Sequence, residues 1–263
     1  MLLHGLGTTQ EIWSLVTAPL GHNRRVVTLD LPGFGESAPV SDGFDLEEVS
    51  DRLARALAAH QVTAPFDLVG HSLGGAVALT LAAHRPNLVQ KLVLVAPAGL
   101  QRRRAPLPVA LIGTGATSLF AARRRLAHLS DRPWGRRLLL AFAAADGATL
   151  SPDQARMMVE ASAPAQRIAQ ATSVIARADL LPLLKSTAGP LGLIWGRRDR
   201  AVPFKTAAEI LALRPDAELE VIDWTGHVPM IERPDSFAVA LDSVLRRLDK
   251  HATSSGASRR RTP

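Results

Sequence analysis

The fold of this chain is decided by one stretch, Phe66-Asp67-Leu68-Val69-Gly70-His71-Ser72-Leu73-Gly74-Gly75. Its first five residues form a short apolar run, as expected of a strand buried on both faces. Ser72 follows, with a glycine two residues before it and another two residues after it, and a helix is predicted over 73–84. The two glycines lack the Cβ atoms that would collide in a sharp turn from strand to helix. An ordinary glycine-rich turn also fits, but the context favours a turn that exposes the Ser72 hydroxyl at a strand end.

Strands and helices alternate on both sides of this stretch. Short apolar runs predict strands at 26–30, 66–70, 91–95, 191–195 and 218–222. Apolar residues spaced three and four apart predict helices at 46–60, 73–84, from about 204, and at 236–248. Asp45 and Glu48 form a capping box ahead of the first helix. Strands separated by helices indicate an α/β fold with a mostly parallel sheet and helices on both faces.

The alternation stops between residues 98 and 186, where helical stretches and arginine clusters occur without a clear strand. This region predicts a helical cap inserted into a core made of residues 1–97 and 187–250. Residues 105–122 carry no charge, but they contain two prolines and two glycines between equally basic flanks. They therefore predict a lid helix and no transmembrane span. Residues 251–263 are small, polar and basic, which predicts a disordered tail.

The composition narrows the function classes. The 263 residues are 47% hydrophobic and 21% charged, as in soluble globular proteins. Zero cysteines exclude disulfides, thiolate nucleophiles and cysteine-ligated metals, and no metal or other cofactor is predicted. The stretch DLPGFGES at 30–37 lacks the third glycine of a dinucleotide fingerprint. No signal peptide is visible at the start, which favours a cytoplasmic protein.

The net charge of +7 is unevenly distributed, because nine arginines and one acid lie between residues 101 and 137. Only Phe120 and Trp134 lie among them, too few to stack nucleic-acid bases, so no nucleic acid is expected as a partner. Two interpretations of this segment stay open. It is a solvated arginine-rich face, or it docks an acidic carrier protein or an anionic lipid surface.

Two later strand ends carry residues that could activate Ser72. A serine hydroxyl is a poor nucleophile until a base takes its proton, and the base needs an orienting acid. Asp199 follows the strand at 191–195, and His227 follows the next strand along the chain. Ligands bind at the carboxyl ends of parallel strands, so these three side chains can converge there. Asp223 is closer to His227 in the sequence, but placement at a strand end favours Asp199.

With these residues in this order, the chain resembles the α/β-hydrolase superfamily, in its capped, esterase-like branch. The resemblance covers residues 2 to about 248 and rests on the segments LLHGLG, DLPGFGES, GHSLGG, GRRDRAVP and GHVPMIERP. It implies that Ser72 is the nucleophile, His227 the general base and Asp199 the orienting acid. It also implies an oxyanion hole from the backbone N–H groups of Leu6 and Leu73.

The resemblance also suggests roles for residues near the predicted triad. His4 and His71 are interpreted as structural, and Asp30 with residues 33–37 is expected to shape a loop next to the site. Members of this family usually carry two strands before the one that ends in His-Gly, whereas Met1 stands three residues ahead of His4. We therefore expect a sheet without those two strands, with the strand at 26–30 as an exposed apolar edge.

The predicted activity is that of a serine hydrolase that cleaves an ester or related acyl bond through an acyl-enzyme. The region 98–186 is rich in Leu, Ala and Val and contains Met157 and Met158, which indicates a small, largely apolar substrate. Epoxide hydrolases and haloalkane dehalogenases place an aspartate at the turn, so Ser72 argues against both. Carbon–carbon bond hydrolases and cofactor-free haloperoxidases share the triad and stay open, as does a catalytically silent binding module.

Overall fold

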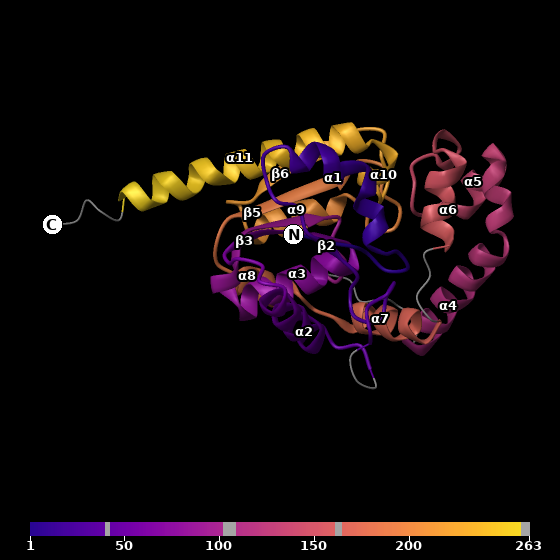
Figure 1. Ribbon diagram of the computed structural model, residues 1–263, viewed down its shortest axis with the longest axis horizontal. Helices are drawn as coiled ribbons and strands as arrows, with labels where there is room; N and C mark the ends of the chain where they lie inside the picture. The colour runs from indigo at the N-terminus through magenta and orange to yellow at the C-terminus, as the bar shows by residue number, and fades with distance from the viewer. Residues whose placement is uncertain (40–42, 102–108, 161–164, 259–263) are drawn as a thin grey trace.

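The computed structural model describes residues 1–39, 43–101, 109–160 and 165–258 (Figure 1). A six-stranded sheet runs through this part of the chain in the order β2-β1-β3-β4-β5-β6, and all neighbouring strands are parallel. The strands are β1 (Leu2–Leu3), β2 (Thr28–Leu29), β3 (Phe66–His71), β4 (Val89–Val95), β5 (Leu191–Gly196) and β6 (Glu218–Ile222). The predicted parallel α/β fold is confirmed.

The helices that precede β4 and follow β5 cover the two faces of the sheet (Figure 1). They are α1 (Ser14–Gly21), α2 (Leu46–Ala59), α3 (Leu73–His84), α9 (Lys205–Leu213), α10 (Pro229–Glu232) and α11 (Pro234–Ser258). Between β4 and β5 lie α4 (Val109–Arg125), α5 (Pro133–Leu139), α6 (Pro152–Glu160), α7 (Ala165–Arg177) and α8 (Leu181–Ser186). Short 3-10 turns occur at Gln10–Trp13, Pro86–Leu88, Ala127–Asp131 and Gly147–Thr149.

The strand side chains alternate between two hydrophobic clusters, one on each face of the sheet. Leu92 and Leu94 of β4 pack with residues of α2 and α3, whereas Val93 and Val95 pack with residues of α1 and α11. Successive side chains of a strand point to opposite faces, and both faces are covered by helices. This arrangement explains why the central strands read as continuous apolar runs in the sequence.

The predicted elements agree with the structure apart from their ends. Helix α2 begins after Asp45, whose carboxylate accepts the backbone N–H groups of Glu47 and Glu48 at 2.9 Å each. Strand β2 is shorter than the predicted 26–30, and it lies at the edge of the sheet with both residues only partly buried. The expected edge position of this segment is confirmed.

The described helices between β4 and β5 share the core of the sheet domain. Leu184 of α8 and Ile168 of α7 lie in the cluster of α2 and α3, while Leu139 of α5 and Met158 of α6 lie in the cluster of α1 and α11. Helices α4, α5 and α6 stack at one end of the molecule (Figure 1). No strand occurs among the described residues of this insertion, as predicted. A cap bounded at residues 98 and 186 stays a prediction.

The C-terminal helix is longer than expected. Helix α11 continues from Pro234 to Ser258 and leaves the body of the molecule (Figure 1), whereas the sequence predicts a helix only over 236–248 and a disordered tail over 251–263. Helix propagation adds one hydrogen bond per residue once a helix is nucleated, so a packed helix can extend past its last core contact. Residues 259–263 lie outside the described part of the chain.

The uncharged stretch 105–122 falls partly within α4, and its first residues lie outside the described part. No helix of the described residues is long and apolar enough to cross a membrane.

The turn after β3 has the strained geometry that its glycines predict. Ser72 has φ 51° and ψ −113°, a backbone conformation that residues with a Cβ atom rarely adopt. A Cβ atom on Gly70 would lie 2.3 Å from the Gly74 carbonyl oxygen. One on Gly74 would lie 2.4 Å from the carbonyl oxygen of His4 and 2.6 Å from that of Leu3. Backbone atoms of neighbouring segments therefore lie so close together at this turn that only glycine fits at positions 70 and 74.

We expect Gly74→Ala to lower the free energy of unfolding by about 1–3 kcal/mol, because the backbone of β1 must move away from the added methyl group. Gly115→Ala is the matched control, since a Cβ there meets nothing within 4 Å and Ala is a better helix former. Denaturant titration of both variants measures the effect. Equal stability of the two variants would contradict the close approach described here.

Candidate active site

The loops after β5 and β6 bring a carboxylate and an imidazole together. Nδ1 of His227 lies 2.7 Å from Oδ2 of Asp199, and both residues are buried. The other carboxylate oxygen of Asp199 accepts the backbone N–H groups of Ala201 and Val202 at 2.8 Å each. The carboxylate is thus held by its own loop and can only accept, so Nδ1 donates to it and Nε2 is not engaged by Asp199.

The competing acid, Asp223, does not contact His227. Its carboxylate is exposed and pairs with the guanidinium of Arg197. Of the two carboxylates considered from the sequence, the structure brings Asp199 to the imidazole.

Ser72 and His227 line the same pocket, which also contains Leu6. The ring hydrogen bond of His227 goes to Asp199, and none joins it to the Ser72 hydroxyl within the described part of the chain. Such bonds are often loose before substrate binds. Leu73 is the first residue of α3, where backbone N–H groups lack a partner within the helix. Its N–H and that of Leu6 make no hydrogen bond among the described turns and loops.

His71, which precedes Ser72, holds the backbone of His227. Its Nε2 lies 2.8 Å from the His227 carbonyl oxygen, which can only accept, so Nε2 donates. The two rings lie 4.7 Å apart between centroids, and Nδ1 of His71 is buried without a partner. Burial and the neighbouring His227 lower the pKa of His71 well below 6.5. A neutral His71 therefore holds the backbone of His227 in place.

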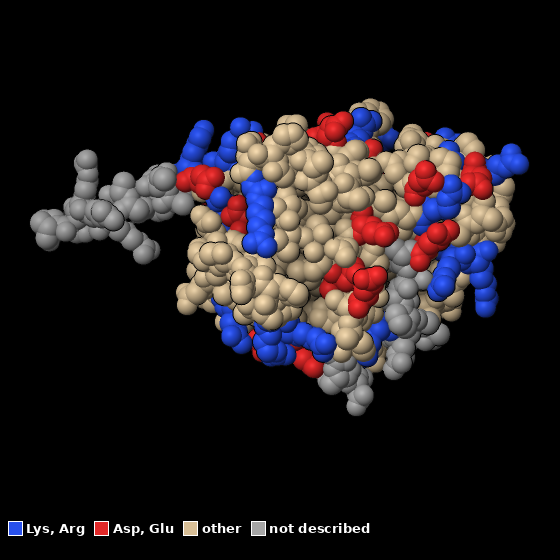
Figure 2. Space-filling view, viewed as in Figure 1, with Lys and Arg blue, Asp and Glu red and all other residues tan. Residues whose placement is uncertain are grey.

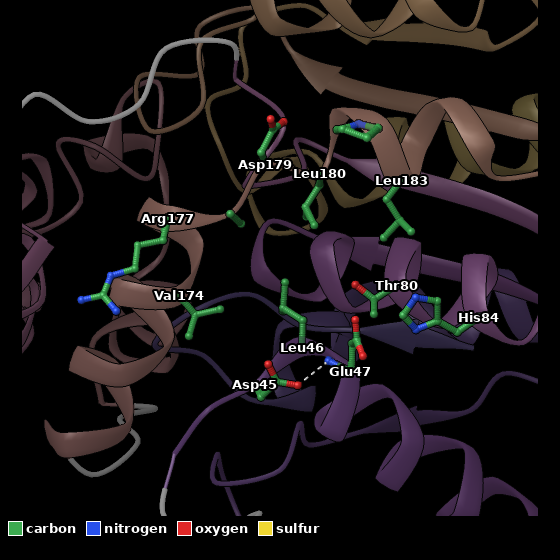
Figure 3. Close-up of a pocket in the computed structure, with 12 residues that line it drawn as sticks. Asp45, Leu46, Glu47, Thr80, His84, Val174, Arg177, Asp179, Leu180 and Leu183 are labelled. Atoms are coloured by element: carbon green, nitrogen blue, oxygen red, sulfur yellow. Dashed lines mark hydrogen bonds between the residues drawn. The ribbon is translucent and has the colours of Figure 1, made fainter.

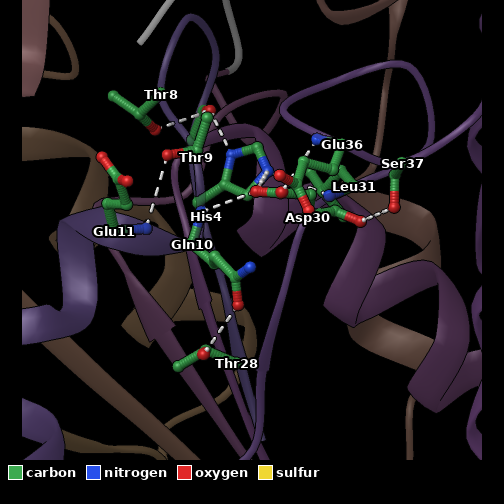
Figure 4. Close-up of polar contacts among 11 residues, drawn as sticks. His4, Thr8, Thr9, Gln10, Glu11, Thr28, Asp30, Leu31, Glu36 and Ser37 are labelled. Atoms are coloured by element: carbon green, nitrogen blue, oxygen red, sulfur yellow. Dashed lines mark hydrogen bonds and ion pairs between the residues drawn. The ribbon is translucent and has the colours of Figure 1, made fainter.

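His4 and Asp30 hold the loop that contains Leu6 (Figure 4). Nδ1 of His4 donates to the Gly5 carbonyl oxygen at 2.8 Å, and Nε2 accepts the Leu31 N–H at 2.9 Å. This pattern requires the neutral ring, and burial lowers its pKa from 6.5 to about 4. Asp30 accepts the backbone N–H of Gln10 at 2.8 Å with one oxygen and that of Glu36 at 3.1 Å with the other.

Asp30 and residues 33–37 form a loop, as expected, but none of them is among the described residues that line the pocket of Ser72. A Cβ atom on Gly35 would lie 2.1 Å from Asp30 Oδ2, and Ser37 Oγ donates to the Asp30 carbonyl oxygen at 2.8 Å. The loop therefore folds around one buried carboxylate, which also holds the residues just after the Leu6 turn.

Glu232 is a site residue that the sequence reasoning missed. One of its carboxylate oxygens accepts the Gly226 N–H at 2.8 Å, and the other accepts the Ala145 N–H at 2.7 Å. The side chain therefore ties the residue before His227 to the inserted region. Burial raises the pKa of Glu232 above 4.5. The available signal was an acid shortly after the histidine in GHVPMIERP, but an acid in an amphipathic helix usually faces solvent.

The pocket around Ser72 has a volume of about 570 Å³ and is mostly apolar. Leu119, Leu138 and Phe142 of the inserted region line it and are themselves 47%, 61% and 66% exposed, so they flank its opening. Met158 lines the pocket from within the core. An apolar site with few polar groups is typical of small-molecule binding.

A second hollow of about 520 Å³ lies between α2, α3, α7 and α8 (Figure 3). Its lining includes Asp45 and His84, but the Asp45 carboxylate caps α2 (dashed line in Figure 3). Ser72, Asp199 and His227 do not line it. Within the described residues, no group of three or more His, Asp or Glu side chains could hold a metal ion.

The arginines of the segment 101–137 have different surroundings in the structure. Arg136 is buried and donates to the Ser130 carbonyl oxygen at 2.8 Å, and Arg137 pairs with Asp146 at 2.9 Å. Arg123 lines the pocket. Residues 102–104 lie outside the described part of the chain. On the face shown in Figure 2, side chains of both signs alternate at the end where α4 to α6 lie.

Comparison with known proteins agrees with this fold and geometry. The sequence profile of the family described as "Alpha/beta hydrolase family" matches residues 1–240. The chain is 34% identical over 262 residues to a pimeloyl-[acyl-carrier protein] methyl ester esterase of Aromatoleum aromaticum, which covers 94% of this chain and 97% of that one. The chain therefore belongs to the alpha/beta hydrolase family, and it is a hydrolase.

Solved structures of other hydrolases have a similar fold. A thermophilic esterase from Thermogutta terrifontis, in its malate-bound form, matches 94% of this chain and 89% of its own with a TM-score of 0.74 and 25% identity. A meta-cleavage product hydrolase from Pseudomonas fluorescens covers 94% and 89% of the two chains, with a TM-score of 0.69 and 23% identity, and shows the fold alone. The esterases among these relatives support hydrolysis of an ester as the reaction.

We expect the stability of the protein to fall as the pH drops from 6.5 towards 4. The folded state disfavours protonation of His4, whereas the unfolded chain takes up the proton near 6.5, so acid favours unfolding. A difference from 6.5 to about 4 corresponds to a loss on the order of 3 kcal/mol.

Thermal unfolding between pH 7.5 and 4.5 measures this loss. The slope of Tm against pH should be shallower in His4→Gln than in the wild type, and His22→Gln, at an exposed histidine, should keep the wild-type slope. Identical slopes in all three proteins would rule out His4 as a source of the acid sensitivity.

Proposed function

We propose that this hydrolase is a serine esterase in which Ser72 is the nucleophile, His227 the general base and Asp199 the orienting acid. The observation that carries the proposal is the 2.7 Å contact between His227 Nδ1 and Asp199, in the pocket that Ser72 also lines. Leu6 and Leu73 supply the backbone N–H groups of the oxyanion hole.

The steps follow from which atoms can give and take protons. Ser72 Oγ attacks the ester carbonyl carbon while His227 Nε2 takes the hydroxyl proton. The two backbone N–H groups stabilise the oxyanion, and each is worth roughly a hundredfold or more in rate. His227 then gives its proton to the departing alcohol. Water, deprotonated by the same nitrogen, attacks the acyl-enzyme and releases the acid and Ser72.

The substrate class follows from the lining of the pocket. Apolar side chains dominate it, which supports a small ester with an apolar acyl or alcohol portion. A relative at 34% identity is named as an esterase of a carrier-linked methyl ester, which supports an acyl chain carried by an acidic protein. Arg125 and Arg132 are exposed and could meet such a carrier, together with residues 102–104.

We expect Ser72→Ala to abolish labelling by a fluorophosphonate and to lower kcat for p-nitrophenyl esters by about 10³-fold or more. Asp199→Asn should lower kcat by roughly 10²–10⁴-fold, because Nδ1 of His227 loses its acceptor. Asp223→Asn is the matched control and should stay within about twofold of the wild type, since that carboxylate binds Arg197.

Wild-type protein that resists labelling would indicate a binding module and sink the proposal. Product analysis on a β-diketone beside a p-nitrophenyl ester separates an esterase from a carbon–carbon bond hydrolase. Peroxide-dependent turnover would favour the haloperoxidase-type alternative.

Docking of an acidic carrier has its own test. Raising the salt concentration, or replacing Arg102, Arg103 and Arg104 with glutamate, should raise KM for a carrier-bound ester, because opposite charges steer the encounter. The same changes should leave kcat for a small free ester unaltered. Carrier-bound turnover that is equal under all these conditions would leave the segment as a solvated face.

A further inference from the structure

Arg123 reaches the pocket from the last turn of α4. It lines the same pocket as Ser72, and its guanidinium carbon lies 5.4 Å from the centroid of the Phe120 ring. Phe120 in turn packs on Gly7, where an added Cβ atom would lie 2.0 Å from the ring. Gly7 follows Leu6 directly. The ring of Phe120 therefore lies between the guanidinium of Arg123 and the loop that contains Leu6 and Gly7.

The charge of Arg123 has no counter-ion among the residues that the structure describes. Its Nε is fully enclosed and has no hydrogen-bond partner. Within the described residues it forms no salt bridge, and none of the described lining residues is Asp or Glu. The other polar side chains of the lining are Thr8, Gln101, His71, Ser72 and His227.

Other arginines of the insertion are accommodated differently. Arg136 is buried but donates to backbone carbonyl oxygens, and Arg137 and Arg156 are paired with aspartates. The side chain of Arg123 is half-buried, and its enclosed Nε–H costs free energy, because it loses water and gains no hydrogen bond. Burial lowers the pKa of Arg123 to about 10, which still leaves it charged near neutral pH.

We infer that Arg123 forms an anion-binding subsite in the esterase pocket and selects esters that carry a second, negatively charged group such as a carboxylate. The subsite rests on the proposed esterase function and names its substrate class more closely. The two Nη groups of Arg123 are not among the enclosed atoms and have no acceptor among the described residues. A carboxylate on the substrate supplies that acceptor, and a planar guanidinium pairs with it through two hydrogen bonds. The cation–π contact with Phe120 holds the guanidinium in place beforehand.

Arg123 is a specificity-determining residue in this arrangement, and it takes no part in the bond-making steps. The apolar remainder of the pocket then receives the chain between the ester and the anionic group. The anion can lie on the acyl side or on the alcohol side of the ester, and the experiment separates the two.

Three substrates of matched length test the subsite on the whole protein. They are the methyl ester of a linear monocarboxylic acid, the half methyl ester of the dicarboxylic acid of equal length, and an ester of a neutral acid with a hydroxycarboxylate as its alcohol. The wild type should favour one anionic ester over the neutral one in kcat/KM. Arg123→Gln should lower kcat/KM for that ester by about tenfold or more, as expected for the loss of a charge-assisted pair.

The loss of kcat/KM in Arg123→Gln should be about tenfold or more greater for that anionic ester than for the neutral one, and the Tm of the variant reports whether it folds. Arg123→Lys keeps the charge and should retain part of the preference. Arg55→Gln, at an exposed arginine of α2, is the matched control and should behave as wild type.

The possible failures are distinguishable. Equal kcat/KM for neutral and anionic esters in the wild type, or an equal loss on both in Arg123→Gln, would overturn the subsite while leaving the esterase in place. If the wild type hydrolyses none of the three esters, the esterase function itself is wrong.

Discussion

The close approach of backbone to backbone at the turn after β3 is the constraint on which the site depends. Gly74 meets the carbonyl oxygens of β1 and of His4, so the first turn of α3 lies directly against the loop that carries Leu6. Ser72 directly precedes that turn, and Ser72 and Leu6 line the same pocket. A side chain at Gly74 would push these two segments apart, and the strained backbone of Ser72 persists only because the surrounding packing holds it.

Buried polar side chains hold the remaining loops. His4 and His71 are buried as neutral rings and use their nitrogens to fix main-chain atoms, while Asp30 and Glu232 accept backbone N–H groups from separate segments. A buried polar group that finds its hydrogen bonds adds rigidity, whereas an unpaired one is costly. Arg123 stands out among the described pocket residues for that reason, because its enclosed Nε has no such partner.

The molecule divides its tasks between the sheet and the insertion. Loops at the carboxyl ends of β1, β3, β5 and β6 carry the residues proposed to react, and the helices between β4 and β5 supply apolar walls of the pocket and the Arg123 guanidinium. Both parts share two hydrophobic clusters, so the insertion is packed as part of the same body. Chemistry and substrate choice are therefore encoded in different stretches of one chain.

The sequence by itself determined the parallel sheet, the glycine turn and the order of Ser72, Asp199 and His227, because strand patterning and steric limits at glycine act over a few neighbouring residues. The sequence also predicted that 26–30 lies at the sheet edge, as observed, but it predicted an end for the last helix at residue 248, ten residues before Ser258. Only the tertiary structure decided which arginines are paired, which is buried and which faces the pocket, and that Glu232 anchors the loop of His227. Those outcomes depend on contacts between residues far apart in the chain, which local periodicity does not encode.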